Sequence, residues 1–452
     1  MILATPEVGA RTRRRIAWRL LPFVFVLYLV AYLDRANMSF AALKMNLDLG
    51  FSDRVYGLGV AMFFTGYVLF EVPGAIIAER WSARKWTARI MISWGLVTVL
   101  SGFVHSPRQF YAARCFLGMA EASFYPAMIV YLTHWIRLSE RGRAVAILYA
   151  AIPSSAVIGS PLAAWLLGIG WRGIAGWRWL FILEGIPAIF LGVVTLFYLT
   201  DWPREATWLT TDEKEWITRE LEIEKLAKHE TSHYTIWNAF RDRRVLMLLL
   251  PCLLANTSSV SVSFWLPTFI KRLSGLPSSR AAVFVLLPAI AGLFGLLING
   301  WHSDKTSERR WHTAIPLACA GACYLLLIPA SAHFALAMTV FAMAGSFMFA
   351  FYPTFWAMPT MILSESAAAA SFGLINSVGH AGDIVGPYII GDLSTRTGSF
   401  LPGFVFIACC YLLAAFFVLR LNIGSPGREA GLPLPHPSAP ANIGRGAQDA
   451  DC

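Results

Sequence analysis

The sequence predicts an all-α membrane protein with twelve transmembrane helices in two pseudo-symmetric six-helix bundles. Three observations lead to this fold class. Of the 452 residues, 57% are hydrophobic and only 14% are charged, whereas a soluble globular chain carries roughly 25% charged residues. Apolar runs long enough to cross a bilayer recur along the whole chain. A polar stretch then separates six such runs from six more.

The individual helices follow from the length of the apolar runs, because a spanning helix needs about 20 mostly apolar residues. The first six runs cover residues 17–40, 55–78, 86–104, 109–136, 143–169 and 177–200. The last six cover residues 245–270, 281–301, 313–331, 334–358, 366–391 and 401–420. We therefore divide the chain into an N-terminal segment, two bundles, a linker and a tail: 1–16, 17–200, 201–244, 245–421 and 422–452.

The linker and the tail differ in composition. The pattern Thr210-x-x-Glu213 is a capping box that predicts the start of a charged amphipathic helix. We expect this helix to lie in water or at the lipid headgroups. The tail is rich in Pro, Gly, Ser and Ala, and we expect it to be disordered.

The net charge of +10 does not indicate nucleic-acid binding, because the basic residues lie in short loops between apolar runs. Counted by loop, 26 Lys and Arg fall on the side of both termini and 9 on the other side. Cytoplasmic loops carry the excess of basic residues. We therefore expect a multi-pass protein of the cell inner (plasma) membrane with both termini in the cytoplasm.

An internal repeat supports two related halves. The loop after the second run begins with Glu79, Arg80 and then Arg84, and the loop after the eighth has Asp304, Lys305 and then Arg309. In both copies an acid is followed at once by a base, and a basic pair follows five and six residues after the acid.

This pair of loops resembles the signature G-x-x-x-D-[RK]-x-G-x-[RK]-[RK] of the major facilitator superfamily. In the second copy Ser307 replaces the preferred Gly, and in the first copy Glu79 replaces Asp and Ala83 replaces Gly. The resemblance implies the major facilitator fold. It also implies a gating role, through charge contacts on the cytoplasmic side, for Glu79, Arg80, Arg84, Asp304, Lys305 and Arg309.

Further motifs resemble the anion:cation symporter branch of that superfamily, in particular its phthalate, tartrate and hydroxyphenylacetate permeases. The resemblance covers residues 15–421. It is carried by the segments 32–37 (YLDRAN), 70–73 (FEVP), 114–122 (RCFLGMAEA), 264–267 (FWLP), 356–360 (WAMPT), 376–379 (NSVG) and 386–387 (GP). In the symporters that it resembles, the matching Asp and Glu carry protons and the matching arginines serve substrate binding or coupling.

Ionisable side chains stand inside several apparent spans. They are Asp34, Arg35, Glu71, Arg114, Glu121 and Asp383. Each costs at least about 2.5 kcal/mol to insert, so such residues face a cavity or pair internally. At 1.5 Å per residue, Asp34 and Arg35 lie at a depth similar to that of Arg114 in the antiparallel fourth helix. Glu121 is two turns further along the same face.

This grouping suggests chemistry. A guanidinium offers a planar fork that matches a carboxylate, so Arg35 and Arg114 are candidates for binding a substrate anion, flanked by Tyr32. Burial at low dielectric favours the neutral form of a carboxyl group. Protonation of Asp34 or Glu121 would therefore free the arginines for substrate, which is a mechanism of proton coupling. The alternative is a set of structural ion pairs.

The eleventh helix carries Asn376, His380 and Asp383 on one face. Asn376 matches a substrate-facing Asn of the resembling permeases, whereas His380 and Asp383 depart from their usual Asn and Gly. We expect His380 to contact a second polar group of the substrate and Asp383 to couple protons. The alternative is a His–Asp pair that only packs against a neighbouring helix.

The sequence thus predicts a secondary active transporter that imports a small organic carboxylate by proton symport and alternating access, as a monomer and without a cofactor. The alternative is a proton-driven exporter of small organic compounds on the same fold. An enzyme is not indicated, because no HExxH, GxSxG or paired-carboxylate protease motif is present. The identity of the carboxylate and the proton stoichiometry stay open.

Overall fold

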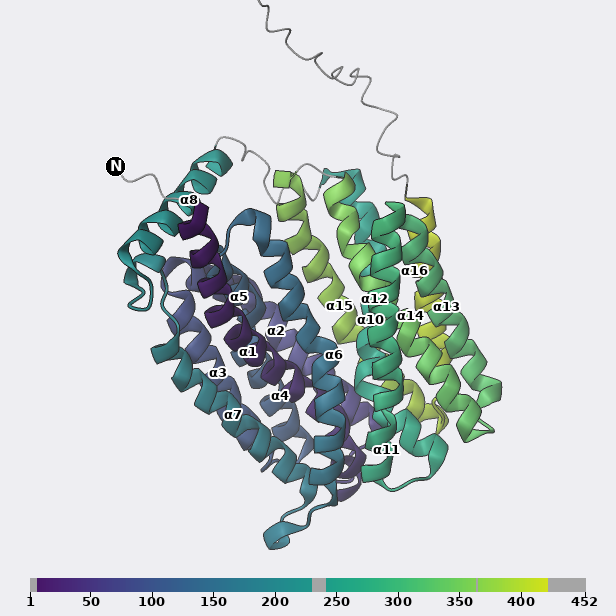
Figure 1. Ribbon diagram of the computed structural model, residues 1–452. Coiled ribbons are helices and arrows are strands. Elements are labelled where there is room, and N and C mark those ends of the chain that lie inside the picture. Colours follow the sequence, from purple (N-terminus) through teal and green to yellow (C-terminus); the bar gives the residue numbers. More distant parts are fainter. Residues whose placement is uncertain (1–5, 230–240, 363–364, 422–452) are drawn as a thin grey trace, which may run out of the picture.

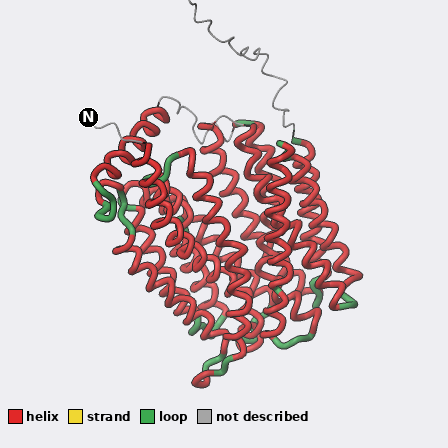
Figure 2. Tube along the Cα trace, viewed as in Figure 1, coloured by secondary structure: helices red, strands yellow, loops and turns green. Residues whose placement is uncertain are grey.

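The computed structural model describes residues 6–229, 241–362 and 365–421, and within these ranges the chain is helical, without strands (Figure 2). The predicted tail and part of the predicted linker lie outside the described residues. In the N-terminal half the long helices are α1 (Pro6–Asp48), α2 (Asp53–Arg80), α3 (Ala83–Ser101), α4 (Pro107–Glu121), α5 (Phe124–Thr133), α6 (Leu138–Gly168) and α7 (Gly176–Tyr198).

The C-terminal half repeats this arrangement. After α8 (Thr211–His229) come α10 (Arg243–Ser274), α11 (Ser278–Phe284), α12 (Leu286–Thr306), α13 (Arg310–Ala330), α14 (Phe334–Ile362), α15 (Glu365–Thr397) and α16 (Leu401–Arg420). Because α4 with α5 and α11 with α12 each form one interrupted span, the described residues make twelve spans, six in each half. This confirms the predicted fold class. Ten of the twelve are apolar enough over 18 residues to cross a membrane; α3 and α15 are the other two.

The two interruptions were not predicted, and both precede a proline. Pro126 lacks the N–H that would bond to the carbonyl of Ala122, and Pro288 lacks the one that would bond to the carbonyl of Phe284. In the first case Ser123 takes a left-handed conformation with φ of 67°. Its hydroxyl donates to the freed carbonyl of Ala122. The helix therefore ends at Glu121.

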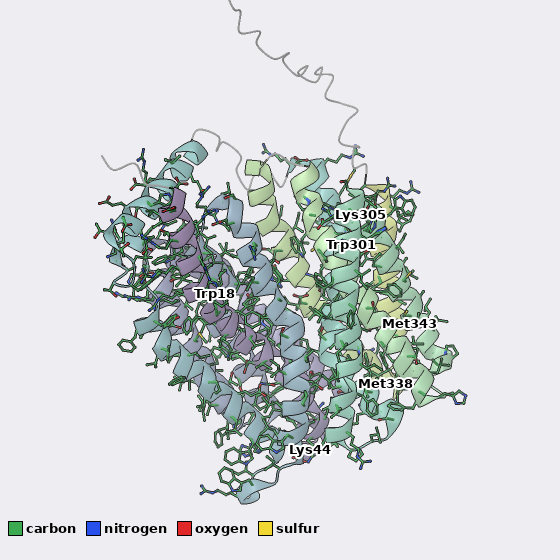
Figure 3. All side chains as sticks on the ribbon, in the orientation of Figure 1. Trp18, Lys44, Trp301, Lys305, Met338 and Met343 are labelled. Carbon is green, nitrogen blue, oxygen red and sulfur yellow. The ribbon has the colours of Figure 1, made fainter. Side chains whose placement is uncertain are left out.

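The halves lie side by side, and the N-terminal half slants so that its lower ends approach the C-terminal half (Figure 1). We call the end where α8 lies the α8 end, and the other the far end. Lys44 marks the far end, and Trp301 and Lys305 lie near the α8 end (Figure 3). The first span is longer than predicted, because α1 extends in both directions beyond residues 17–40.

Polar contacts join the halves at the far end. The Arg272 guanidinium donates to both carboxylate oxygens of Asp53, each at 2.7 Å, and the Ser394 hydroxyl donates to Asp53 at 2.6 Å. Lys271 donates to the carbonyl of Leu43. We call the group of Asp53, Arg272 and Ser394 the far-end clamp. It holds α2 against α10 and α15.

The predicted capping box is present at the start of α8. The backbone N–H of Thr210 donates to Glu213 Oε2 at 3.0 Å. In a capping box the Thr210 hydroxyl would accept from the backbone N–H of Glu213. Here the hydroxyl donates to Asp212 instead. Glu213 is buried and also accepts from Arg11 and Arg15 of α1, at 3.0 Å each. The linker helix is therefore fastened to the start of the first span.

Candidate functional site

The site begins with the close packing of α2 against α4. A Cβ atom on Gly118 would lie 1.9 Å from the carbonyl oxygen of Phe63, and one on Gly66 would lie 2.3 Å from that of Cys115. Only glycine permits this approach. As a result Arg114 is buried one turn from Gly118, with its guanidinium 4.7 Å from the Phe63 ring.

Arg35 and Glu121 form an ion pair across the N-terminal bundle. Arg35 Nε donates to Glu121 Oε1 at 2.5 Å. The Glu121 side chain is 1% exposed, whereas that of Arg35 is 21% exposed. Arg35 also lies over the rings of Tyr32 and Tyr67, at 5.2 and 5.0 Å. Of the two candidate anion-binding arginines, Arg35 is therefore the accessible one in this conformation.

Asp34 and Arg114 lie behind this pair. Both are buried, and Asp34 interacts electrostatically with Arg114 and with Glu121. Glu121 Oε2, Asp34 Oδ1 and Arg114 Nε have no hydrogen-bond partner among the described residues. The four charged residues thus form one compact group with unused donors and acceptors, which we call the arginine–carboxylate group. Charges in this state respond strongly to a proton or an anion, because little water screens them.

The predicted site residues of α15 form a second group with an acid from the other half. His380 Nδ1 bonds to Asp383 Oδ2 at 2.6 Å, and His380 Nε2 lies 3.9 Å from Glu71 Oε1 of α2. Asn376 Nδ2 bonds to Glu71 at 3.4 Å and to His380 at 3.1 Å. Sequence reasoning noted Glu71 as an intramembrane charge but did not place it at the site. We call these four residues the histidine group.

Tyr67 connects the two groups. The Arg35 guanidinium lies 5.0 Å from the centroid of its ring, and the ring centroid of His380 lies 5.5 Å from the same centroid. Arg35 also acts electrostatically on both Glu71 and His380. The structure therefore brings the predicted binding and coupling residues of both halves into one region between α1, α2, α4 and α15. Tyr67 was missed because a single Tyr in an apolar run carries no distinguishing pattern.

The predicted gating residues lie apart from this region, where α2 ends and α3 begins and where α12 ends and α13 begins. Lys305, one of them, lies near the α8 end (Figure 3). In the second copy Arg309 pairs with Asp304 at 2.5 Å, and Lys305 lies 5.4 Å from the Trp301 ring. Ser307 takes φ of 53° at the end of α12, a conformation that explains the Gly preferred there. In the first copy Glu79 and Arg80 are exposed.

The partner of Arg84 was not foreseen. Its backbone N–H donates to Asp201 Oδ1 at 3.0 Å, and its guanidinium lies 3.8 Å from Asp201 Oδ2. Asp201 follows α7, so the contact ties the start of α3 to the end of the sixth span. Both signature pairs connect residues of their own half.

No group of three or more His, Cys, Asp or Glu within the described ranges could hold a metal ion. The site combines buried charges of both signs with tyrosines and an imidazole at the junction of two helical bundles. This arrangement, inside a protein with twelve spans, is that of a membrane transport protein.

The chain belongs to the major facilitator superfamily, whose family model matches residues 24–387. A putative tartrate transporter of Agrobacterium vitis is 41% identical over 93% of this chain and 96% of its own length. A quinolone resistance transporter of Acinetobacter baumannii is 36% identical over 88% of this chain and 92% of its own. These findings confirm the resemblance inferred from the sequence motifs.

Solved structures agree with the fold. A bacterial homologue of the human lysosomal transporter Spinster, in an inward-facing and unoccupied conformation, superposes with a TM-score of 0.75. It covers 92% of this chain and 99% of its own, at 18% sequence identity. At this identity the similarity concerns the fold alone.

Proposed function

We propose that the protein imports a small organic carboxylate together with protons across the inner membrane, by alternating access. The observation that carries this proposal is the ion pair between the partly exposed Arg35 and the buried Glu121. A substrate carboxylate and Glu121 compete for the same guanidinium. Protonation of Glu121 removes its negative charge and leaves Arg35 able to bind the substrate.

In this mechanism Asp34 competes with the substrate for Arg114, as Glu121 does for Arg35, and protonation of Asp34 leaves Arg114 able to bind the substrate. Asp34 and Glu121 are the proton-coupling residues, and Arg35, Arg114 and Tyr32 bind the carboxylate. The histidine group lies opposite, across Tyr67. Asn376 and His380 are placed to contact a second polar group of the substrate, and Asp383 fixes the orientation of the imidazole and takes part in proton coupling.

The membrane topology that fits this direction has the α8 end, with both termini, in the cytoplasm. Its support is the excess of basic residues in the loops at that end. The far-end clamp then closes the site from the outside. The signature pairs Arg84–Asp201 and Asp304–Arg309 stand at the cytoplasmic surface as gating contacts. The protein works as a monomer, since each chain contains a complete site.

The second candidate function is proton-driven export of small organic compounds. It is favoured by the similarity to a protein named a quinolone resistance transporter. Import is preferred because two arginines and two carboxylates in one buried group suit an anion that arrives with protons. The similarity to a putative tartrate transporter supports an anionic substrate. It also suggests a hydroxylated dicarboxylate as the first compound to test.

The test measures the thermal stability of the purified protein against a panel of small carboxylates at acidic and neutral pH. We expect one acid to stabilise the wild type, more strongly at acidic pH. Arg35→Ala should weaken its binding by about 1.5–3 kcal/mol, the value of hydrogen bonds to charged groups, which is roughly ten- to a hundredfold.

Arg13→Ala is the matched control, because Arg13 is an exposed α1 arginine at the α8 end that pairs with Glu140. It should bind like the wild type. Stabilisation by organic amines, but by no small carboxylate of the panel, would instead favour the alternative function, export.

A further inference from the structure

A groove with apolar walls opens on the surface of the C-terminal half, between α10 and α16. The two helices are joined where the Ser258 hydroxyl donates to the carbonyl of Ile407 at 3.1 Å and where the hydroxyls of Ser259 and Tyr411 bond at 2.9 Å. From there towards the α8 end, residues of both helices line a groove of about 570 Å³. None of them belongs to the arginine–carboxylate group or to the histidine group, so the proposed transport mechanism does not use the groove.

The walls of the groove expose large apolar side chains. Leu246 and Leu250 of α10 are 43% and 40% exposed, and Phe416 of α16 is 47% exposed. They lie within two of the membrane-spanning helices, where the surroundings of the protein are lipid acyl chains. The groove is therefore suited to an acyl chain.

Two arginines stand at the α8 end of the groove. Arg243 begins α10 and Arg420 ends α16, and both are exposed and line the groove. The ion pairs of the described residues include neither of them. The described lining residues include no acid, since Asp242 lies outside the groove. The end of the groove is therefore positively charged.

The arginines lie at the ends of their spans. Arg310, which begins α13 five residues after Lys305, donates to the carbonyl of Leu419, so α16 ends at the α8 end, where Lys305 lies (Figure 3). Leu250 is seven residues further along α10 than Arg243, about 10 Å at 1.5 Å per residue. The groove thus runs from charged groups at headgroup depth into the apolar part of the membrane.

A second groove, of about 460 Å³ between α3 and α4, shows what distinguishes the first. Its arginine is already engaged, because the Arg89 guanidinium donates to the carbonyl of Ala120 at 3.3 Å and lies 4.0 Å from the Trp86 ring. The described residues offer the guanidiniums of Arg243 and Arg420 no hydrogen-bond acceptor. Two unpaired cations above an apolar groove are complementary to a lipid with an anionic headgroup.

We propose that the groove between α10 and α16 binds an anionic phospholipid. Its phosphate lies between Arg243 and Arg420, and one acyl chain lies along Leu246, Leu250 and Phe416. A guanidinium forms parallel charge-assisted bonds to phosphate oxygens. In a zwitterionic phospholipid the ammonium group of the headgroup offsets the phosphate charge, so a lipid such as phosphatidylglycerol is preferred. The site is independent of the cargo and of the direction of transport. In the proposed topology its lipid comes from the cytoplasmic leaflet.

The first experiment is native mass spectrometry of the delipidated full chain with phosphatidylglycerol or with phosphatidylcholine of the same acyl chains. We expect the wild type to bind one phosphatidylglycerol more tightly than phosphatidylcholine. A basic residue near an anionic headgroup contributes roughly fivefold in affinity. The double variant Arg243→Gln/Arg420→Gln should therefore bind phosphatidylglycerol roughly twenty-five-fold more weakly and lose the preference.

The matched control is Arg14→Gln/Arg143→Gln, which removes two exposed arginines of α1 and α6 in the other half. It should bind like the wild type. Equal binding of the two lipids by the wild type, or an unchanged preference in Arg243→Gln/Arg420→Gln, overturns the proposal. Displacement of the lipid by the water-soluble headgroup glycerophosphoglycerol at equal concentration would also overturn it, because the apolar walls would then contribute nothing.

The second experiment uses the wild type alone and so does not depend on the folding of a variant. A phosphatidylglycerol with a photoreactive group in one acyl chain is cross-linked to the protein in bilayers, and the labelled peptides are identified. We expect label on residues 246–250 and 416–417 that an excess of unlabelled phosphatidylglycerol removes and an excess of phosphatidylcholine does not. Label spread evenly over the spans, or removed equally by both lipids, contradicts a specific site.

Discussion

At the scale of single residues, the site is a set of charges that compensate one another without solvent. Arg35 is satisfied by Glu121, while Asp34 and Arg114 each keep an unused polar atom. Removing one member of a buried pair leaves the other uncompensated, at a cost of about 3–5 kcal/mol. Charge-neutral replacements that keep the shape of a side chain are therefore the informative variants here.

Glu121→Gln keeps the shape of the side chain and removes its charge. We expect the variant to bind the carboxylate at neutral pH as tightly as the wild type does at acidic pH. In the variant, Glu121 no longer competes with the substrate for Arg35 through a charge-assisted bond of about 1.5 kcal/mol. The affinity for the carboxylate at neutral pH should therefore rise roughly tenfold. Calorimetric titration at several pH values measures this.

The same variant should no longer accumulate substrate against a gradient in response to an imposed pH difference. Normal pH-driven accumulation by Glu121→Gln would contradict the assignment of Glu121 as a proton-coupling residue.

Asp383→Asn tests the histidine group. The bond from His380 to Asp383 fixes the orientation of the imidazole ring. Without the carboxylate we expect weaker substrate binding and a pH dependence of transport that differs from that of the wild type. Glu140→Gln, an exposed acid of α6 outside the site, is the control for a lost carboxylate. If transport and its pH dependence were unchanged in Asp383→Asn, the His–Asp pair would be a packing contact only.

At the scale of the elements, local sequence rules determine where the helices start and stop. The capping box of α8 was predictable because Thr210 and Glu213 stand at a fixed spacing. The end of α4 was not, because the proline that causes it lies five residues beyond Glu121, inside an apolar run that reads as continuous. Likewise the pairing of Arg84 with Asp201 was not predictable. It depends on how the sixth span packs against the third, and no local sequence pattern indicates that packing.

The attachment of α8 depends on pH through Glu213. Burial acts to raise the pKa of Glu213, but the Thr210 N–H and the two arginines outweigh it and lower the pKa below its usual value. A lowered pKa means that the attachment is complete above the ordinary pKa of a glutamate, about 4.3, and is lost as the pH falls through the lowered one. The protection of the α8 amides, measured as the exchange rate relative to that of the unfolded chain at the same pH, should therefore be high at neutral pH and fall only in acid.

Glu213→Gln should accelerate that exchange at neutral pH, with a loss of about 1 kcal/mol as for other helix caps. Glu215→Gln, a neighbouring acid of the same helix for which the structure records no ion pair, is the matched control. Equal exchange in both variants would show that Glu213 does not fasten the linker.

At the scale of the whole molecule, composition and charge already define twelve spans in two halves, because the bilayer leaves few alternatives for so apolar a chain. The similar depth of Asp34, Arg35, Arg114 and Glu121 in the sequence also predicted that these four residues lie together. The choice of Glu121 as the partner of Arg35 was not predictable, since it depends on how the helices are rotated.

The far-end clamp sets the balance between conformations. Asp53→Asn removes the charge that Arg272 and Ser394 share, and we expect the far end to open more often. Asp53 is buried but Arg272 is about half exposed, and a pair that solvent reaches in this way contributes up to about 1 kcal/mol, which corresponds to roughly fivefold in population. Distances between spin labels on the far-end loops of the two halves measure this shift.

Asp48→Asn is the control for the clamp, because Asp48 lies at the same end but bonds to Trp177 within its own half. It should leave the distance distribution unchanged. If Asp53→Asn gave the wild-type distribution as well, the clamp would have no part in closing the far end.

One feature of α2 has a mechanical consequence. The helix carries Asp53 at one end and Glu71 eighteen residues later, about 27 Å along the axis at 1.5 Å per residue, and its middle is interlocked with α4 backbone against backbone. Because α2 is interlocked with α4 in this way, it moves as one body, and a movement that separates Asp53 from Arg272 also displaces Glu71 relative to Asn376 and His380. Opening of the far-end clamp and displacement of Glu71 relative to α15 are then one and the same movement of α2.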